Sequence, residues 1–236
     1  MICSIQINSN MNFIRTALIK SALMLIFLML VIAGCKKNNE PDSVTDGDGN
    51  VYETITIGTQ EWLKTNLKAT KFNDGTPIPN VTLATEWKGL STPAYCWYDN
   101  ATSNKEIFGG LYNWHTVNSG KLCPSGFHVP SRDEWITLKT FLGNNGGGAM
   151  KSISALWDSP NQGATNSSGF SALPGGMRED NDAALFQYKG EQAVFWCSTQ
   201  TGPGNADAFY LYADQTYLED YEYSKTLGAS VRCIRN

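Results

Sequence analysis

Residues suited to catalysis are scarce in this chain. Its two histidines, His115 and His128, belong to no metal-binding or nucleophile motif. Glu179, Asp180 and Asp182 form a small acidic group, which a solvated loop explains better than the paired carboxylates of a glycosidase. An enzyme needs a nucleophile beside a base, paired carboxylates or a metal cluster, and a pocket that brought His115 or His128 against a carboxylate and a free thiol would favour that alternative. We therefore predict that the protein is not an enzyme and has no catalytic residue, cofactor or metal site.

Aromatic and amide side chains indicate a binding role instead. The chain has 7 tryptophans and 10 tyrosines in 236 residues. Aromatic faces stack on sugar rings, and Asn or Asp side chains bond the sugar hydroxyl groups. The candidate ligand-binding residues are Tyr210, Tyr212, Tyr217, Tyr221, Tyr223, Asn161, Asn166 and Arg178. For the tyrosines, the alternative is that they are ordinary strand residues. Four tryptophans are expected to be core anchors, namely Trp62, Trp114, Trp135 and Trp196.

Two main function classes fit these features. The first is a non-catalytic envelope lipoprotein that binds a glycan or a protein partner. The second is a structural or adhesive envelope component without a small ligand. The formal net charge of −4 and the lack of a Lys/Arg run argue against nucleic acid as a partner. We expect a monomer.

The N-terminus predicts export. Arg15 and Lys20 accompany an apolar run at 22–33, which is too short to span a bilayer. Small residues then lead to Cys35, so residues 1–34 are predicted to be a signal peptide. This junction resembles a bacterial lipobox, which implies that the Cys35 thiol carries lipid. The alternative is an ordinary signal peptide followed by a coincidental cysteine.

The segment after the signal peptide is polar. Residues 35–50 are predicted to be a lipidated tether, and the lipid would be the membrane anchor. Lys36 and Lys37 do not resemble the aspartate that retains a lipoprotein in the inner membrane, so we predict the outer membrane. The periplasmic and cell-surface faces both remain open. Translation begins at Met1 or at Met11.

A helix is predicted at 132–142. Ser131 is placed as its N-cap, and Glu134 three residues later completes a capping box. Apolar residues recur on one face of this segment, and Gly143 ends it. Strands are predicted at 51–57, 60–63, 96–98, 170–173, 194–198, 208–213 and 229–234. A glycine-rich break is expected at 144–148, with a short second helix at 149–157.

Four cysteines follow the tether. In an exported protein they indicate two disulfides, with three possible connectivities. We favour Cys123–Cys233, which would tie the helix entry to the last strand, and Cys96–Cys197. For the second pair, two free buried thiols are the alternative. The spacing fits no zinc site.

Several segments resemble a known family. They are YCWY at 95–98, GLYNW at 110–114, CPSGFHVP at 123–130, GATN at 163–166, GFSALPGG at 169–176 and SVRCIR at 230–235. In this order they resemble the Fibrobacter succinogenes major paralogous domain family. The resemblance implies a protein from Bacteroidetes-like bacteria, in which such domains are often lipidated.

A second resemblance concerns the fold. HVPSRDEW at 128–135, followed by VRC at 231–233, is similar to the sulfatase-modifying-factor and C-type-lectin-like group. It implies an α+β, C-type-lectin-like domain over 51–236 with one main amphipathic helix, small twisted antiparallel sheets and long ordered loops. The last strand would pair near the first. An enzyme related to sulfatase-modifying factors is a third alternative, but oxidised cysteines at 197 and 233 would exclude that chemistry.

Overall fold

The computed structural model describes residues 42–180 and 183–236. The predicted signal peptide 1–34, the lipidation residue Cys35 and Asp182 lie outside the described residues. The strands are β1 (Ser43–Thr45), β2 (Val51–Ile57), β3 (Gln60–Leu63), β4 (Tyr95–Cys96), β5 (Leu111–Tyr112), β6 (Phe127–His128), β7 (Gly175–Arg178), β8 (Phe186–Lys189), β9 (Gln192–Gln200), β10 (Asn205–Tyr212), β11 (Glu219–Ser224) and β12 (Ile234–Arg235). The α-helices are α2 (Ala84–Trp87), α3 (Lys105–Phe108), α4 (Trp114–Val117), α5 (Arg132–Leu142) and α6 (Gly146–Met150). Short 3-10 turns η1 (Tyr98–Asn100) and η2 (Thr102–Asn104) precede α3.

One sheet joins the beginning and the end of the domain. Its strand order is β1-β2-β3-β12-β6. The β2–β3 hairpin has the predicted bounds, and Gly58 supplies the left-handed backbone of its turn with a φ of 62°. Ile234 of β12 pairs with Trp62 of β3 and with His128 of β6. The last strand therefore lies beside the first hairpin, as expected.

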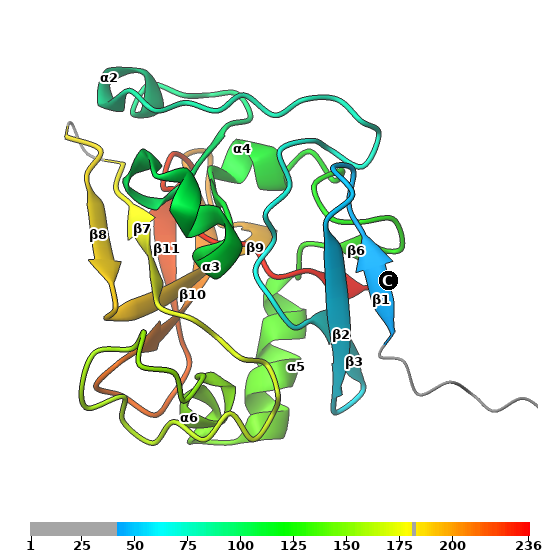
Figure 1. Cartoon of the computed structure of the whole chain (residues 1–236), viewed down its shortest axis with the longest axis vertical. Helices are drawn as coiled ribbons and strands as arrows, with labels where there is room; N and C mark the ends of the chain where they lie inside the picture. The colour runs from blue at the N-terminus through cyan, green and yellow to red at the C-terminus, as the bar shows by residue number, and fades with distance from the viewer. Residues whose placement is uncertain (1–41, 181–182) are drawn as a thin grey trace, which may run out of the picture. The chain divides into compact units, whose positions relative to one another are not determined.

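A second sheet has the strand order β11-β10-β9-β7-β8. Strands β9, β10 and β11 run antiparallel in sequence order, whereas β7 pairs parallel to β9 through Gly176 and Ala193. This sheet lies on the left in Figure 1, with β8 at its edge. The order brings β7 and β8 to the strands that contain the predicted tyrosines.

Helix α5 packs between these sheets (Figure 1). Ser131 and Glu134 form the predicted capping box at its start. The buried Trp135 stacks on Phe209 of β10, with ring centroids 5.0 Å apart, and lies 4.9 Å from the Trp62 ring of β3. The predicted bounds of this helix are confirmed, because a cap and an apolar face are signals carried by neighbouring residues.

The β9–β10 hairpin separates two apolar cores. Side chains of a strand alternate between its faces, so Ala208 and Tyr210 face the core that contains Trp196, whereas Phe209 faces the core of Trp135. The four tryptophans expected to be core anchors are all buried: Trp62, Trp114, Trp135 and Trp196.

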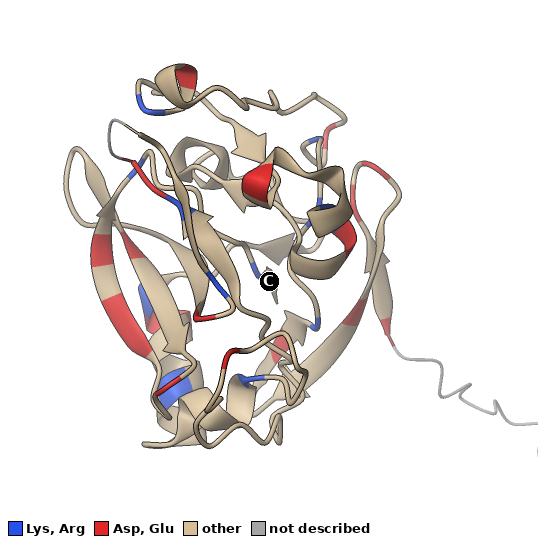
Figure 2. Cartoon of the chain, turned by 60° about the vertical axis from the view of Figure 1, so that its left-hand side comes forward, with Lys and Arg blue, Asp and Glu red and all other residues tan. Residues whose placement is uncertain are grey.

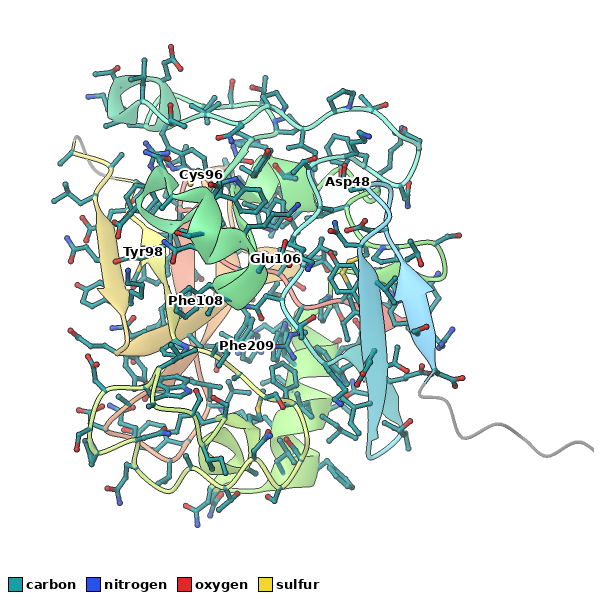
Figure 3. The ribbon with its side chains drawn as sticks, in the orientation of Figure 1. Asp48, Cys96, Tyr98, Glu106, Phe108 and Phe209 are labelled. Atoms are coloured by element: carbon teal, nitrogen blue, oxygen red, sulfur yellow. A yellow bond between two sulfur atoms is a disulfide. The ribbon has the colours of Figure 1, made fainter. Side chains whose placement is uncertain are left out.

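One of the two predicted disulfides is present. Cys123 is bonded to Cys233 across a sequence separation of 110, which fastens the entry of α5 to the last strand. The predicted Cys96–Cys197 bond is wrong, because both residues are free thiols buried in the described domain. The two cysteines belong to different apolar cores. Figure 3 labels Cys96 itself and, for the other core, Phe209, which shares it with Cys197.

The glycine-rich segment after α5 is a break only at residues 144–145, which form a turn, and its three glycines are helical. They begin α6, and the helix expected at 149–157 ends at Met150. A Cβ on Gly147 would lie 2.4 Å from the Tyr217 carbonyl oxygen, and one on Gly148 would lie 2.3 Å from that of Gly163. These glycines let neighbouring backbones approach closely. The strand expected at 170–173 is also wrong, since only a bridge from Ala172 forms there.

The folded domain begins earlier than residue 51. Strand β1 pairs antiparallel with β2. The Asp46 carboxylate accepts hydrogen bonds from the Tyr52 hydroxyl at 2.6 Å and from the Asn50 backbone N–H at 3.0 Å. The predicted tether at 35–50 is therefore too long, because its second half is part of the fold.

The described domain is α+β, with more strand than helix. In the part of the chain with described coordinates, no helix has the length and apolar character needed to cross a bilayer.

Candidate functional site

A pocket of about 160 Å³ opens beside the second sheet. Residues from β8 to β11 and from the end of β7 line it. The polar and aromatic members are Glu179, Asp180, Tyr188, Gln192, Tyr212 and Tyr223. Two of these, Tyr212 and Tyr223, are predicted ligand-binding residues.

The strand register explains why the tyrosines meet here. Tyr223 of β11 pairs with Ala206 of β10, and Tyr221 pairs with Ala208. The small alanine side chains leave room for both aromatic rings to lean along the sheet. Tyr210 consequently lies 5.4 Å from the Tyr223 ring and 5.6 Å from the Tyr221 ring, measured between centroids.

Tyr210 lies behind the pocket wall with an unsatisfied hydroxyl group. Its side chain is 1% exposed, and its Oη has no hydrogen-bond partner among the described residues. Its ring stacks on both wall residues, Tyr223 and Tyr212, the latter at 6.0 Å. Burial raises the pKa of Tyr210 most, and the Tyr223 hydroxyl group, which comes near without meeting hydrogen-bond geometry, raises it next, followed by Tyr212 and Asp180. The hydroxyl group is therefore within electrostatic reach of three pocket residues. Buried polar groups normally have partners, so this exception needs an explanation.

Tyr188 reaches the pocket through an unusual backbone conformation. Its φ is 63°, in the left-handed region, which costs a residue with a side chain about 1–2 kcal/mol. Gly176 on the facing strand β7 has the same φ of 63°. Backbone strain of this kind is concentrated at functional sites, which directs attention to the same pocket.

Acceptor groups dominate the polar part of the pocket. Glu179 and Asp180 contribute carboxylates, and Gln192 contributes an Oε1 that is buried without a partner in the described structure. No Lys or Arg occurs among the described residues that line it. Acidic residues also gather along the neighbouring strand β11, where Figure 2 shows them in red.

The remaining predicted tyrosines lie outside this pocket. Tyr221 is 45% exposed, and its hydroxyl donates to the Glu219 carboxylate at 2.6 Å. Tyr217 lines a separate, open groove of about 750 Å³ between α5 and the β10–β11 connection, together with Lys139 and Glu219. Tyr212 and Tyr223 thus line the pocket and Tyr217 lines the groove, whereas neither Tyr210 nor Tyr221 is a lining residue of either.

The predicted amide residues shape loops. The Asn166 side chain donates to the Ser171 hydroxyl at 2.9 Å and accepts from the Ser171 N–H at 2.8 Å. Asn161 donates to the Ser152 carbonyl at 3.0 Å. Both asparagines have positive φ, which asparagine tolerates better than most residues. Neither of them lines the tyrosine pocket.

Arg178, the remaining candidate ligand-binding residue, is not on a long loop. Arg178 lies on β7 and is 1% exposed. Its guanidinium donates to the carbonyls of Val81 and Thr82 at 2.8 and 2.9 Å, and it stacks on the Trp87 ring. Arg178 therefore holds the α2 loop against the sheet rather than reaching toward a surface ligand.

His128 lies against a carboxylate at the start of α5. Its Nε2 is 2.9 Å from Glu134 Oε1, and its Nδ1 is 2.8 Å from Asn236 Oδ1. Ser131 Oγ donates to Glu134 rather than to His128, so these residues do not form the serine–histidine pair of a hydrolase. The cysteine in the small pocket beside His128 is Cys123, which is oxidised. The described residues also contain no group of His, Cys, Asp and Glu that could hold a metal ion.

Sequence reasoning missed part of the pocket. The sequence does not mark Tyr188 and Gln192 as ligand-binding residues. For Glu179 and Asp180, it predicts a solvated loop. No local pattern marks Tyr188, because its position depends on the β7–β8 pairing. The acidic group at 179–182 is the one feature of the sequence that points to this pocket.

Comparison with known proteins identifies the family. No curated protein and no solved structure matches the chain. The family model described as the Fibrobacter succinogenes major domain matches residues 55–235, a range that includes the whole pocket. Because this match covers most of the chain and agrees with the motif resemblance, the chain belongs to the Fibrobacter succinogenes major domain family.

Proposed function

We propose that the domain is a non-catalytic glycan-binding module and that the tyrosine pocket holds one sugar ring. The observation that carries this proposal is the pocket lining, in which the rings of Tyr188, Tyr212 and Tyr223 surround the Gln192 amide oxygen, a buried acceptor without a partner among the described residues. A sugar hydroxyl near these walls would supply hydrogen-bonding groups, and the tyrosine rings would supply stacking surface.

The pocket volume limits what can bind. At about 160 Å³, it lies below the roughly 300–1,000 Å³ of complete small-molecule sites. This volume suits one sugar ring at the end or side of a longer glycan. The rest of the saccharide would extend over the exposed part of β11, where Tyr221 is accessible.

The proposed cellular setting is an outer-membrane lipoprotein anchored through Cys35. The signal-peptide and lipobox patterns support this setting. For the fold, we propose a C-type-lectin-like domain. The capped helix α5 ahead of the second sheet, and the pairing of β12 with β3, support that assignment.

Glycan binding is tested with the full chain in detergent on an array of neutral, amino and acidic saccharides, followed by calorimetry. The variant is Tyr188→Asn, which removes an aromatic wall while asparagine tolerates the left-handed backbone. We expect affinity to fall by about tenfold or more, since truncating an aromatic anchor at a binding site commonly costs about 2 kcal/mol.

Tyr217→Ala is the matched control, because it removes a tyrosine from the separate groove. It should bind like the wild type. If Tyr217→Ala loses binding and Tyr188→Asn does not, the ligand occupies the groove. Absence of saturable binding to every saccharide would refute the glycan proposal and favour a structural or adhesive role.

A further inference from the structure

The tyrosine pocket contains more hydrogen-bond acceptors than donors. Glu179 and Asp180 contribute carboxylates at one side, and the Gln192 amide oxygen is buried without a partner among the described side chains. Carboxylates accept hydrogen bonds and donate none. Donor groups or a positive charge on a ligand would therefore complement this side of the pocket.

The electrostatic surroundings are negative as well. Burial raises the pKa of Tyr212, and its neighbours Tyr221 and Glu219 raise it further. Burial also dominates the raised pKa of Tyr210, to which Asp180 contributes. Residues with positive side chains are missing from the described lining. A ligand with a positive charge would be attracted to the pocket, whereas a carboxylate or phosphate would be repelled.

Aromatic walls complete the arrangement. Tyr188, Tyr212 and Tyr223 approach from three different strands. Tyrosine rings attract cations through the negative potential of their faces. An ammonium group combines three donors with a positive charge and has no acceptor, so it meets each of these requirements.

We propose that the tyrosine pocket selects an amino sugar with a free ammonium group over its N-acetylated or neutral counterpart. This inference rests on the proposed glycan function and specifies its substrate class. Two observations beyond the acidic residues support it: the Gln192 amide oxygen that lines the pocket without a partner among the described residues, and the three tyrosine rings that surround it from three strands.

The test compares three probes by calorimetry with the full chain at pH 6. They are a glucosamine trisaccharide, the fully N-acetylated trisaccharide of the same linkage, and tetramethylammonium. At this pH, an amine with a pKa of about 7.7–8.0, like an α-amino group, is mostly charged. We expect the glucosamine trisaccharide to bind about tenfold tighter than the acetylated one, and tetramethylammonium to compete with it.

Asp180→Asn should remove that preference. Glu222→Gln removes a charge from β11 at a residue that does not line the pocket, and it should keep the preference. Equal binding of the two trisaccharides, or a preference that survives Asp180→Asn, would overturn the ammonium inference while leaving the glycan function intact. Binding of tetramethylammonium without either trisaccharide would overturn the amino-sugar preference and retain a cation site. Failure of all three probes would overturn the ammonium inference, whereas the glycan function is refuted only by a failure of every saccharide on the array.

Discussion

At the scale of single residues, Tyr210 and Tyr112 present a useful contrast. Both are buried tyrosines of the same core. The Tyr112 hydroxyl donates to the Ala69 carbonyl at 2.8 Å, whereas the Tyr210 hydroxyl finds no partner in the described structure. An unsatisfied buried group destabilises the folded state, so its retention is consistent with a role toward a ligand.

The contrast leads to a stability prediction. Tyr210→Phe removes the unsatisfied hydroxyl and is expected to raise the free energy of unfolding by about 1 kcal/mol. Tyr112→Phe, the matched control, leaves a carbonyl unpaired and is expected to lower it by about 1–2 kcal/mol. Urea unfolding of both variants measures the difference. An equal loss in both would show that the Tyr210 hydroxyl is already satisfied within the protein.

The sequence predicts a strand at 208–213 that contains Tyr210 and Tyr212, but it predicts no strand for Tyr221 and Tyr223, which lie on β11. Their pairing with Ala208 and Ala206 is a finding of the structure. Their spacing does not reveal that Tyr223 borders a pocket while Tyr221 faces solvent, because that depends on β7 and β8. Arg178 was a candidate ligand-binding residue, but it is buried and its guanidinium donates to backbone carbonyl oxygens.

At the scale of elements, the start of α5 concentrates several interactions on one carboxylate. Glu134 accepts from the Ser131 N–H at 2.8 Å and from the Ser131 hydroxyl at 2.9 Å, and His128 lies beside it. Burial by itself raises the pKa of Glu134, but the hydrogen bonds from Ser131 and His128 outweigh burial and lower it.

This shift predicts a pH dependence of stability. The folded-state pKa of Glu134 lies below its ordinary value of 4.5, so the contribution is complete above that pH and is lost as pH falls through the lowered pKa. Glu134→Gln lacks the contribution at every pH. Urea unfolding at pH 7 and pH 3.5 should therefore show a smaller pH dependence in the variant. An unchanged dependence would exclude Glu134 as a source of acid sensitivity.

Elements defined by neighbouring residues were predictable, and those defined by distant contacts were not. Helix α5 and the β2–β3 hairpin contain their own caps and turns, so their bounds agree with the sequence pattern. Strand β7 begins at Gly175, beyond the end of the strand predicted at 170–173. Its pairing with β8 includes a residue with left-handed backbone conformation on each strand, Gly176 and Tyr188. An alternating pattern of apolar and polar residues does not indicate such positions.

At the scale of the whole molecule, sheet order creates the pocket. The strands that line it are arranged β11-β10-β9-β7-β8, and β7 joins the sheet through a parallel pairing with β9. Such a crossover is not encoded in any one segment of the sequence. Two long-range features could be predicted from cysteine positions and family motifs. They are the disulfide between Cys123 and Cys233 and the pairing of the last strand, β12, with β3.

Hydrogen–deuterium exchange on the full chain, with and without the saccharide that binds best on the array, tests glycan binding at the tyrosine pocket most directly. The proposal predicts added protection at residues 186–192 and 219–224, which carry the pocket walls, with no change at 136–144 beside the separate groove. Protection confined to 136–144, or no protection at the pocket under saturating saccharide, would contradict it.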